Sequence, residues 1–131
     1  MDETGDSSVL LVARCLLAGL FLWWGAGTVG GYAGAAQLAS DDGLLGLLLP
    51  ASVVIEITGA LLLVIGYKMR LVALVLAGFS VVTALLFHAN FADKAQTAHF
   101  LTNFAVTGGL LALYVAGPGR LSFDGVNDAT D

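Results

Sequence analysis

Four long apolar blocks are the feature of this sequence that most constrains its fold. They run from Val9 to Val29, from Leu44 to Gly66, from Leu71 to Ala89 and from Phe100 to Ala116. Each is close to the roughly 20 residues that an α-helix needs to cross the hydrocarbon of a bilayer. Backbone groups inside a bilayer must satisfy one another, which favours helices, and no block alternates as a transmembrane strand does. The sequence therefore predicts an all-α fold, a four-helix transmembrane bundle.

Composition agrees with this fold and excludes several classes of protein. Hydrophobic residues make up 58% of the chain and charged residues 11%, whereas soluble domains carry roughly a quarter charged residues. Five Lys and Arg residues against ten Asp and Glu give a net charge of −5, so no binding to nucleic acid is expected. Cys15 is the only cysteine, which argues against a disulfide scaffold and against C-x-x-C redox chemistry. The lipid bilayer is the expected first partner of the chain.

Charges in the connecting segments predict the orientation of the bundle. With four crossings, both termini share one side of the membrane with the short segment between the second and third blocks. That side holds Lys68, Arg70 and Arg120, whereas the opposite side holds Lys94. By the positive-inside rule, both termini are expected in the cytoplasm.

The domain organisation follows from these blocks. An acidic N-terminal tail (1–8) precedes a four-helix domain (9–117), and a cytoplasmic C-terminal tail (118–131) follows it. The end of the chain, from Gly125 to Asp131, contains mostly small and acidic residues. Such a segment has too little apolar surface to bury, so it is expected to be disordered.

Two ionisable residues lie inside apolar blocks, Arg14 in the first and Glu56 in the second. Such a residue costs at least about 2.5 kcal/mol at the centre of a transmembrane helix. The two residues lie at similar depth, within reach of an extended arginine side chain if their helices are neighbours. We therefore expect a buried polar pair with two open interpretations. It is either an ion pair that fixes helix register or a catalytic pair in which Glu56 handles protons.

Two histidines frame the polar segment between the third and fourth blocks. His88 ends the third block, and His99 precedes the fourth. His99, Asn103 and Thr107 follow at intervals of four residues, which places them on one face of a helix. His88, His99 and Asn103 are candidates to hydrogen-bond a quinone headgroup, and the alternative is that they cap or join helices. No metal site is expected, because no Cys or carboxylate stands at ligand spacing from the histidines.

Aromatic residues gather toward the same predicted side of the membrane as the histidines. An interfacial girdle explains them, and a flat wall for a quinone ring is the alternative. The residues are Trp23, Trp24, Tyr32, Phe87, Phe91 and Phe100.

The order of these features resembles the DoxX family of bacterial four-helix membrane proteins over residues 12 to 125. The resemblance rests on Arg14 followed by the stretch Phe21 to Gly25, EITGALLLVIG from Glu56 to Gly66, Arg70, FHANF from Phe87 to Phe91, FLTNFAVTGGLLAL from Phe100 to Leu113, and GPGRLSFDG from Gly117 to Gly125. One position departs from the pattern. Family members often carry a Lys shortly after the glycine near the end of the first helix, where this chain has Thr28.

This resemblance implies a multi-pass protein of the bacterial plasma (inner) membrane. It also implies quinone-coupled oxidation, because the family name derives from a subunit of a thiosulfate-oxidising, quinone-reducing complex. The chain has no flavin, haem or iron–sulfur motif, so we expect no intrinsic cofactor and a role as the membrane subunit of a quinone-linked oxidoreductase system. A quinone and other membrane or redox subunits would be its partners.

Three questions stay open at the level of sequence. One is whether the chain is an enzyme by itself, and another is whether it forms a homo-oligomer. The third is the function itself, because two alternatives stand beside the oxidoreductase subunit. They are a non-catalytic accessory or assembly subunit of a larger membrane complex, and a small transporter.

Overall fold

The computed structural model describes residues 3–31 and 44–128, most of them in five α-helices. The helices are α1 (Glu3–Gly30), α3 (Leu44–Ile65), α4 (Met69–Phe87), α5 (Lys94–Ala116) and α6 (Phe123–Asp128). The first four are long and apolar enough to cross a membrane. The described residues include no strand. The predicted all-α fold with four membrane-spanning helices is confirmed.

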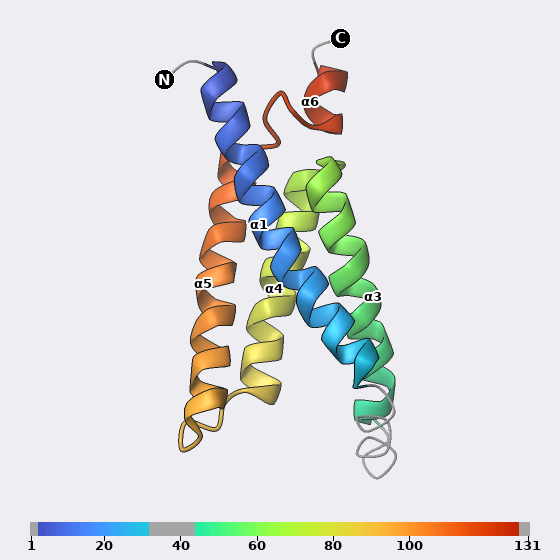
Figure 1. Cartoon of the computed structure of the whole chain (residues 1–131), viewed down its shortest axis with the longest axis vertical. Helices are drawn as coiled ribbons and strands as arrows, with labels where there is room; N and C mark the ends of the chain where they lie inside the picture. Colours follow the sequence, from blue (N-terminus) through green and yellow to red (C-terminus); the bar gives the residue numbers. More distant parts are fainter. Residues whose placement is uncertain (1–2, 32–43, 129–131) are drawn as a thin grey trace.

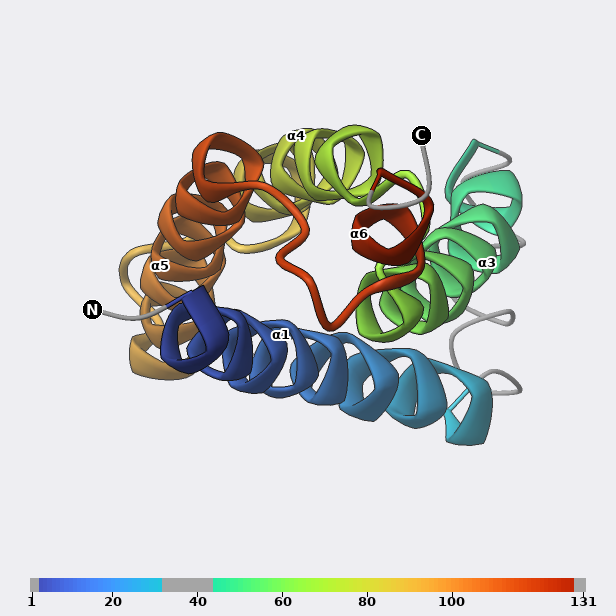
Figure 2. The ribbon, with the colours of Figure 1, turned by 90° about the horizontal axis from the view of Figure 1, so that it is seen from above.

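The four long helices run along the long axis of the molecule (Figure 1). The start of α1, the turn between α3 and α4, and α6 lie together at one end, which we call the terminal end. The opposite end, which we call the hairpin end, carries the turn between α4 and α5 and the end of α1. The closest packing joins α1 to α3 and α4 to α5. Seen from above, the segment that follows α5 passes over the centre of the bundle (Figure 2).

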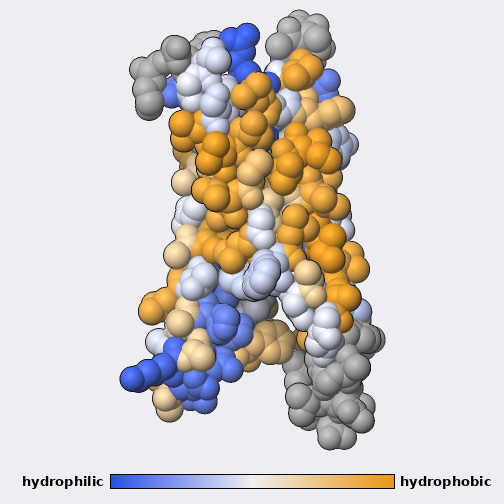
Figure 3. Space-filling view, viewed as in Figure 1, coloured by the Kyte–Doolittle hydropathy of each residue, from blue (hydrophilic) through white to orange (hydrophobic). Residues whose placement is uncertain are grey.

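Small and branched apolar side chains form the core between the helices. Fully buried members include Phe21, Ala60, Leu63, Ala73 and Leu110. Alanine at such positions allows helix backbones to approach closely, as is common in membrane bundles. The face of the molecule shown in Figure 3 is also largely apolar along its length, and its strongly hydrophilic residues lie toward the ends, above all around the turn between α4 and α5. An apolar surface of this extent fits contact with lipid.

Two helices begin six residues before the apolar blocks that predicted them. α1 begins at Glu3 rather than Val9, and α5 begins at Lys94 rather than Phe100. The cause at α5 is its N-cap, because Asp93 Oδ1 accepts hydrogen bonds from the backbone N–H groups of Ala95 (2.8 Å) and Gln96 (3.4 Å). Hydropathy therefore marks the membrane portion of each helix, whereas capping determines where the helix starts.

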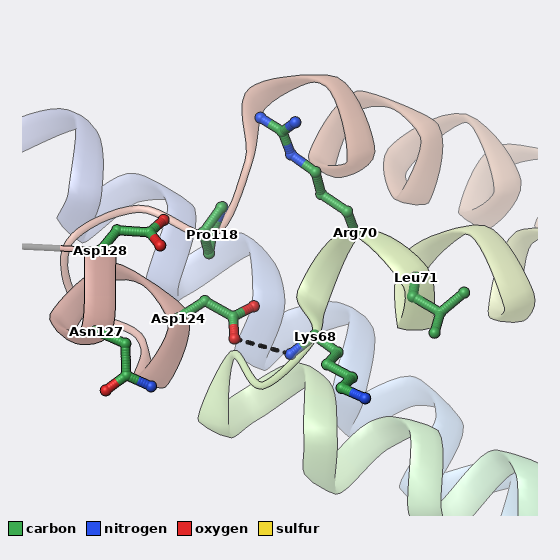
Figure 4. Close-up of a pocket in the computed structure, with 7 residues that line it drawn as sticks. All are labelled: Lys68, Arg70, Leu71, Pro118, Asp124, Asn127 and Asp128. Atoms are coloured by element: carbon green, nitrogen blue, oxygen red, sulfur yellow. Dashed lines mark hydrogen bonds between the residues drawn. The ribbon is translucent and has the colours of Figure 1, made fainter. Parts of the chain in front are cut away.

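The C-terminal segment is ordered where disorder was predicted, so that prediction is wrong for residues 125–128, which belong to α6. Asp124 explains the difference. Its two carboxylate oxygens accept hydrogen bonds from the backbone N–H groups of Lys68 and Met69, 2.9 Å each, and its own N–H donates to the Gly66 carbonyl (3.1 Å). Figure 4 shows the bond to Lys68. Composition alone did not predict that this segment is ordered, because its order depends on one acidic side chain, Asp124, which caps the start of α4.

Candidate functional site

A pocket of about 630 Å³ lies toward the hairpin end. All four long helices contribute residues to its wall. Most of the lining is apolar or aromatic, including Trp23, Trp24, Phe79 and Phe87. Its volume falls in the range of small-molecule sites. Four predicted site residues also line it, namely Glu56, His88, His99 and Asn103.

Glu56 supplies the buried carboxyl group of this pocket. Its side chain is 7% exposed, and its Oε2 atom has no hydrogen-bond partner in the described part of the chain. The residue lies at a close approach of α1 to α3, because a Cβ atom at Gly25 would stand 3.5 Å from Glu56 Oε2 and 3.0 Å from Ile57 Cγ1. Buried polar atoms in native proteins nearly always have a partner. A partner for Glu56 is therefore expected from outside the described residues.

The two histidines lie close together at the α4–α5 turn. Their ring centroids are 5.1 Å apart, with 30° between the ring planes. The His88 Nδ1–H group donates to Gln96 Oε1 over 2.9 Å, since a carbonyl oxygen can only accept. In the neutral ring, Nε2 of His88 is then the acceptor. His99 is exposed, so this pair connects the pocket with the surface at the hairpin end.

Asn103 stands one helical turn after His99 on α5 and is 4% exposed. Its Nδ2 group donates to the His99 carbonyl over 3.0 Å, and its backbone carbonyl accepts a hydrogen bond from Thr107 Oγ1 over 2.8 Å. The predicted polar face of α5 therefore exists. His99 and Asn103 line the pocket, whereas Thr107 does not.

Arg14 does not join this group. It is fully buried at the terminal end, where its Nη2 group donates to the Leu121 carbonyl and its Nε and Nη1 atoms have no partner among the described residues. A Cβ atom at Gly66 would collide with its Nη1 atom, so the guanidinium packs against the turn that ends α3. Gly66 follows Glu56 by ten residues, about 15 Å along a helix. No hydrogen bond or ion pair joins the two described residues Arg14 and Glu56, so the expected pair does not form in this structure.

The direction of side chains along a helix explains this separation. Side chains lean toward the N-terminus of their own helix. α1 starts at the terminal end and α3 starts at the hairpin end (Figure 1). Arg14 and Glu56 therefore lean in opposite directions, although their helices are neighbours.

Several lining residues were not singled out as ligand contacts by the sequence. Ser52 precedes Glu56 by four residues, so helical spacing could have found it. Thr28 is the departure from the family pattern, and it lines the pocket as well. Of the predicted aromatic group, Trp23, Trp24 and Phe87 are in the lining, whereas Phe91 and Phe100 instead contact each other with centroids 5.0 Å apart. Tyr32 lies outside the described residues.

A second pocket, of about 460 Å³, lies at the terminal end beside α6. Figure 4 shows its lining, in which Lys68 and Arg70 stand among the carboxylates Asp124 and Asp128. Both oxygens of Asp124 already bind the start of α4. Its mixed charges and its part in docking α6 make this pocket a weaker candidate for a ligand.

Comparison with known proteins agrees with this architecture. The chain forms a multi-pass bundle with a mostly apolar pocket toward one end, and a sequence model of the DoxX family matches residues 9–89. The inner membrane protein YqjF of Escherichia coli (strain K12) is 41% identical over 124 residues, which cover 95% of each chain. The inner membrane protein YphA of the same organism is 29% identical over 124 residues, 88% of each chain. No solved structure matches.

The chain therefore belongs to the DoxX family, as its sequence motifs indicated. The predicted localisation, multi-pass in a bacterial inner membrane, is confirmed as well. The matched region includes Glu56 and His88 but ends before His99 and Asn103.

Proposed function

We propose that this chain is the membrane subunit of a quinone-linked oxidoreductase system, and that the pocket at the hairpin end holds the quinone headgroup. The observation that carries the proposal is the pocket itself. Its mostly apolar and aromatic lining includes a buried carboxyl group, that of Glu56, whose Oε2 atom has no partner among the described residues, together with two histidines.

The residues present fit such a ligand. A flat ring with polar atoms at its edges matches a mostly apolar cavity that carries a few placed polar groups. The Trp24 ring is held by an edge-to-face contact with the buried Phe21, centroids 5.8 Å apart, which gives the wall a fixed position. When bound, a quinone supplies the capacity to accept two electrons and two protons.

The side chains of this chain would bind the headgroup and manage protons. Glu56 can hold or release a proton at Oε2 inside the pocket. His88, whose Nδ1 is fixed by Gln96, presents Nε2, and the exposed His99 beside it can exchange protons with water. Asn103 supplies a further polar contact. Electrons would come from another subunit or from a substrate, because the sequence has no flavin, haem or iron–sulfur motif.

We also propose an orientation. The terminal end carries Lys68, Arg70 and Arg120, and the hairpin end carries Lys94. By the positive-inside rule the terminal end faces the cytoplasm, and the pocket lies toward the outer surface.

Binding can be followed with the tryptophans of the chain. The chain has two, and both line the pocket, so quenching of their fluorescence reports on its occupant. We expect a short-chain ubiquinone to bind the protein in lipid nanodiscs saturably. We expect the Glu56→Gln variant to bind the reduced form, ubiquinol, about tenfold more weakly, because a ubiquinol hydroxyl group can donate to the Glu56 carboxylate and this hydrogen bond to a charged group is lost. Empty nanodiscs correct for partition of the quinone into lipid.

Thr58→Val is the matched control, since Thr58 lies two residues further along α3, is exposed, and is not part of the pocket lining. His99→Ala is a second variant, chosen because an exposed side chain is rarely needed for folding. Equal affinity for ubiquinol in all four proteins would refute the proposal. Retention of a non-redox partner complex in place of a quinone, detected by native mass spectrometry, would instead favour an accessory or assembly subunit.

A further inference from the structure

Three polar side chains on the pocket wall each donate a hydrogen bond within their own helix. The hydroxyl groups of Thr28 and Ser52 and the Nδ2 group of Asn103 donate to backbone carbonyls three or four residues earlier, over 2.8–3.0 Å. Short polar side chains commonly bind helix backbones in this way. Thr28 and Ser52 then have only oxygen lone pairs left for a ligand, which accept hydrogen bonds, whereas Asn103 keeps the acceptor Oδ1 and the second N–H of its amide.

Glu56 and His88 also offer hydrogen-bond acceptors to a ligand. When Glu56 is ionised its carboxylate accepts only, and its buried Oε2 atom has no partner among the described residues. The His88 Nδ1–H group is used by Gln96, so the neutral ring offers the acceptor Nε2. Donors on the lining come from Thr83, His99, the second N–H of the Asn103 amide and the indole groups of Trp23 and Trp24. His99 and Trp23 are exposed, and the Thr83 hydroxyl can accept as readily as it donates. The buried part of the wall is therefore rich in acceptors.

We infer that this pocket selects ligands that donate hydrogen bonds, and that it binds the hydroquinone form of its ligand in preference to the quinone form. The inference rests on the proposed function and adds the redox form to it. A quinone carries two carbonyl acceptors, whereas its hydroquinone carries two hydroxyl donors. A quinone oxygen placed against Glu56 would leave the carboxylate without a partner, which is the unfavourable arrangement. Sites built to bond a hydroxyl group reject analogues without one.

The preference has a measurable redox consequence. One hydrogen bond to a charged acceptor favours the hydroquinone by roughly tenfold to a hundredfold. For a two-electron couple, each tenfold preference for the reduced form raises the midpoint potential by about 30 mV.

The test compares donor and non-donor members of matched pairs. Decylubiquinol, kept reduced under anaerobic conditions, is compared with decylubiquinone. The redox-inert pair 4-nonylphenol and its methyl ether is compared in the same way. Binding to the whole chain in nanodiscs is measured by tryptophan fluorescence, with empty nanodiscs as the correction for partition. We expect the donor member of each pair to bind at least about tenfold more tightly.

Two variants test whether Glu56 and His88 cause the preference for ligands that donate hydrogen bonds. In Glu56→Gln, the amide both donates and accepts, so the preference should fall below about threefold. In Gln96→Ala, His88 is free to present a donor, so the preference should shrink there as well. Gln96 lies at the partly exposed start of α5, which keeps this variant informative if Glu56→Gln fails to fold. Thr58→Val, on the lipid-facing side of α3, should keep the full preference.

The outcomes separate this inference from the proposed function. Saturable binding of both ubiquinone forms with equal affinity, or tighter binding of the quinone, would overturn the inference and leave the proposed function standing. Absence of binding by either form would overturn both. A preference that persists in Glu56→Gln and Gln96→Ala would also overturn it. Tighter binding of tetraphenylphosphonium than of 4-nonylphenol or its methyl ether would also overturn the inference, since the pocket would then be a site for lipophilic cations.

Discussion

Replacing Asp124 with alanine tests how the terminal end of the bundle is closed. Lys68 is the N-cap residue of α4, and it makes no side-chain capping bond of its own. Asp124 takes over that role, although it lies 56 residues from Lys68 and 55 residues from Met69 in sequence. Its carboxylate accepts hydrogen bonds of 2.9 Å from the backbone N–H groups of both residues. The substitution therefore removes a helix cap and the contact that docks α6.

The expected cost can be worked out from these contacts. Loss of an N-cap acceptor costs about 1 kcal/mol, with values up to about 2 kcal/mol. Bonds to a carboxylate are roughly twice as strong as neutral ones. Met69 is fully buried, so its N–H group is hard for water to reach once the carboxylate is gone. We expect Asp124→Ala to lower the free energy of unfolding by about 2 kcal/mol.

Unfolding of the purified protein in mixed detergent micelles, followed by circular dichroism against the fraction of denaturing detergent, measures this change. Asp128→Ala is the matched control, because Asp128 is an exposed carboxylate on the same short helix and makes neither bond. We expect that control to stay within about 0.5 kcal/mol of the wild type. Asp124→Asn, which keeps one oxygen acceptor, should fall between the two. Equal stability of Asp124→Ala and Asp128→Ala would refute the reasoning.

Three further predictions concern packing and orientation. Gly59→Ala should cost about 1–3 kcal/mol by overpacking in the same unfolding assay, because the new Cβ would stand 2.7 Å from the buried Leu76 side chain; a neutral effect would contradict the helix contact. Gly66→Ala should cost more than Gly59→Ala, since φ is +76° there and the Cβ would meet the buried guanidinium of α1. In a cysteine-free background, Lys94→Cys should react with an impermeant maleimide on intact cells and Lys68→Cys only after lysis, and the reverse pattern would overturn the orientation.

The fold was predictable because it depends most strongly on hydropathy along the sequence, which can be read without knowing any contact between helices. A block of about 20 apolar residues is a membrane helix wherever it lies in the fold, so hydropathy alone predicts four of them. The start of α5 was not predictable from hydropathy, because Asp93 begins the helix in a polar segment. The docking of α6 depends on a contact between Asp124 and a turn far away in the sequence, which no local pattern reports.

The candidate site was predictable in part, for a similar reason. The spacing of four between His99 and Asn103 places both on one face of α5, and both line the pocket. That Glu56 of α3 and His88 of α4 share the same pocket depends on how each helix is rotated, which packing with its neighbours determines. The expectation that Arg14 pairs with Glu56 rested only on the similar depth of the two residues in the membrane. It omitted the direction in which side chains lean along antiparallel helices.

Because Arg14 and Glu56 are separated, we expect the two ends of the bundle to have different roles. The terminal end would contribute to stability and the hairpin end to ligand binding. Arg14 bonds the Leu121 carbonyl, and the Arg120 N–H group donates to Ser7 Oγ over 3.1 Å, so these contacts hold the C-terminal segment across the terminal end. Arg14 is not part of the pocket lining, and its Nη2 contact with a backbone carbonyl ties it to the C-terminal segment, although its Nε and Nη1 atoms have no partner among the described residues. Glu56 has no such contact and faces a pocket. Arg14→Met should therefore reduce stability and leave the affinity for 4-nonylphenol unchanged. Glu56→Gln should weaken that affinity while the protein remains folded. A folded Arg14→Met protein that binds the phenol about tenfold more weakly would contradict this division, because the terminal end would then contribute to the ligand site.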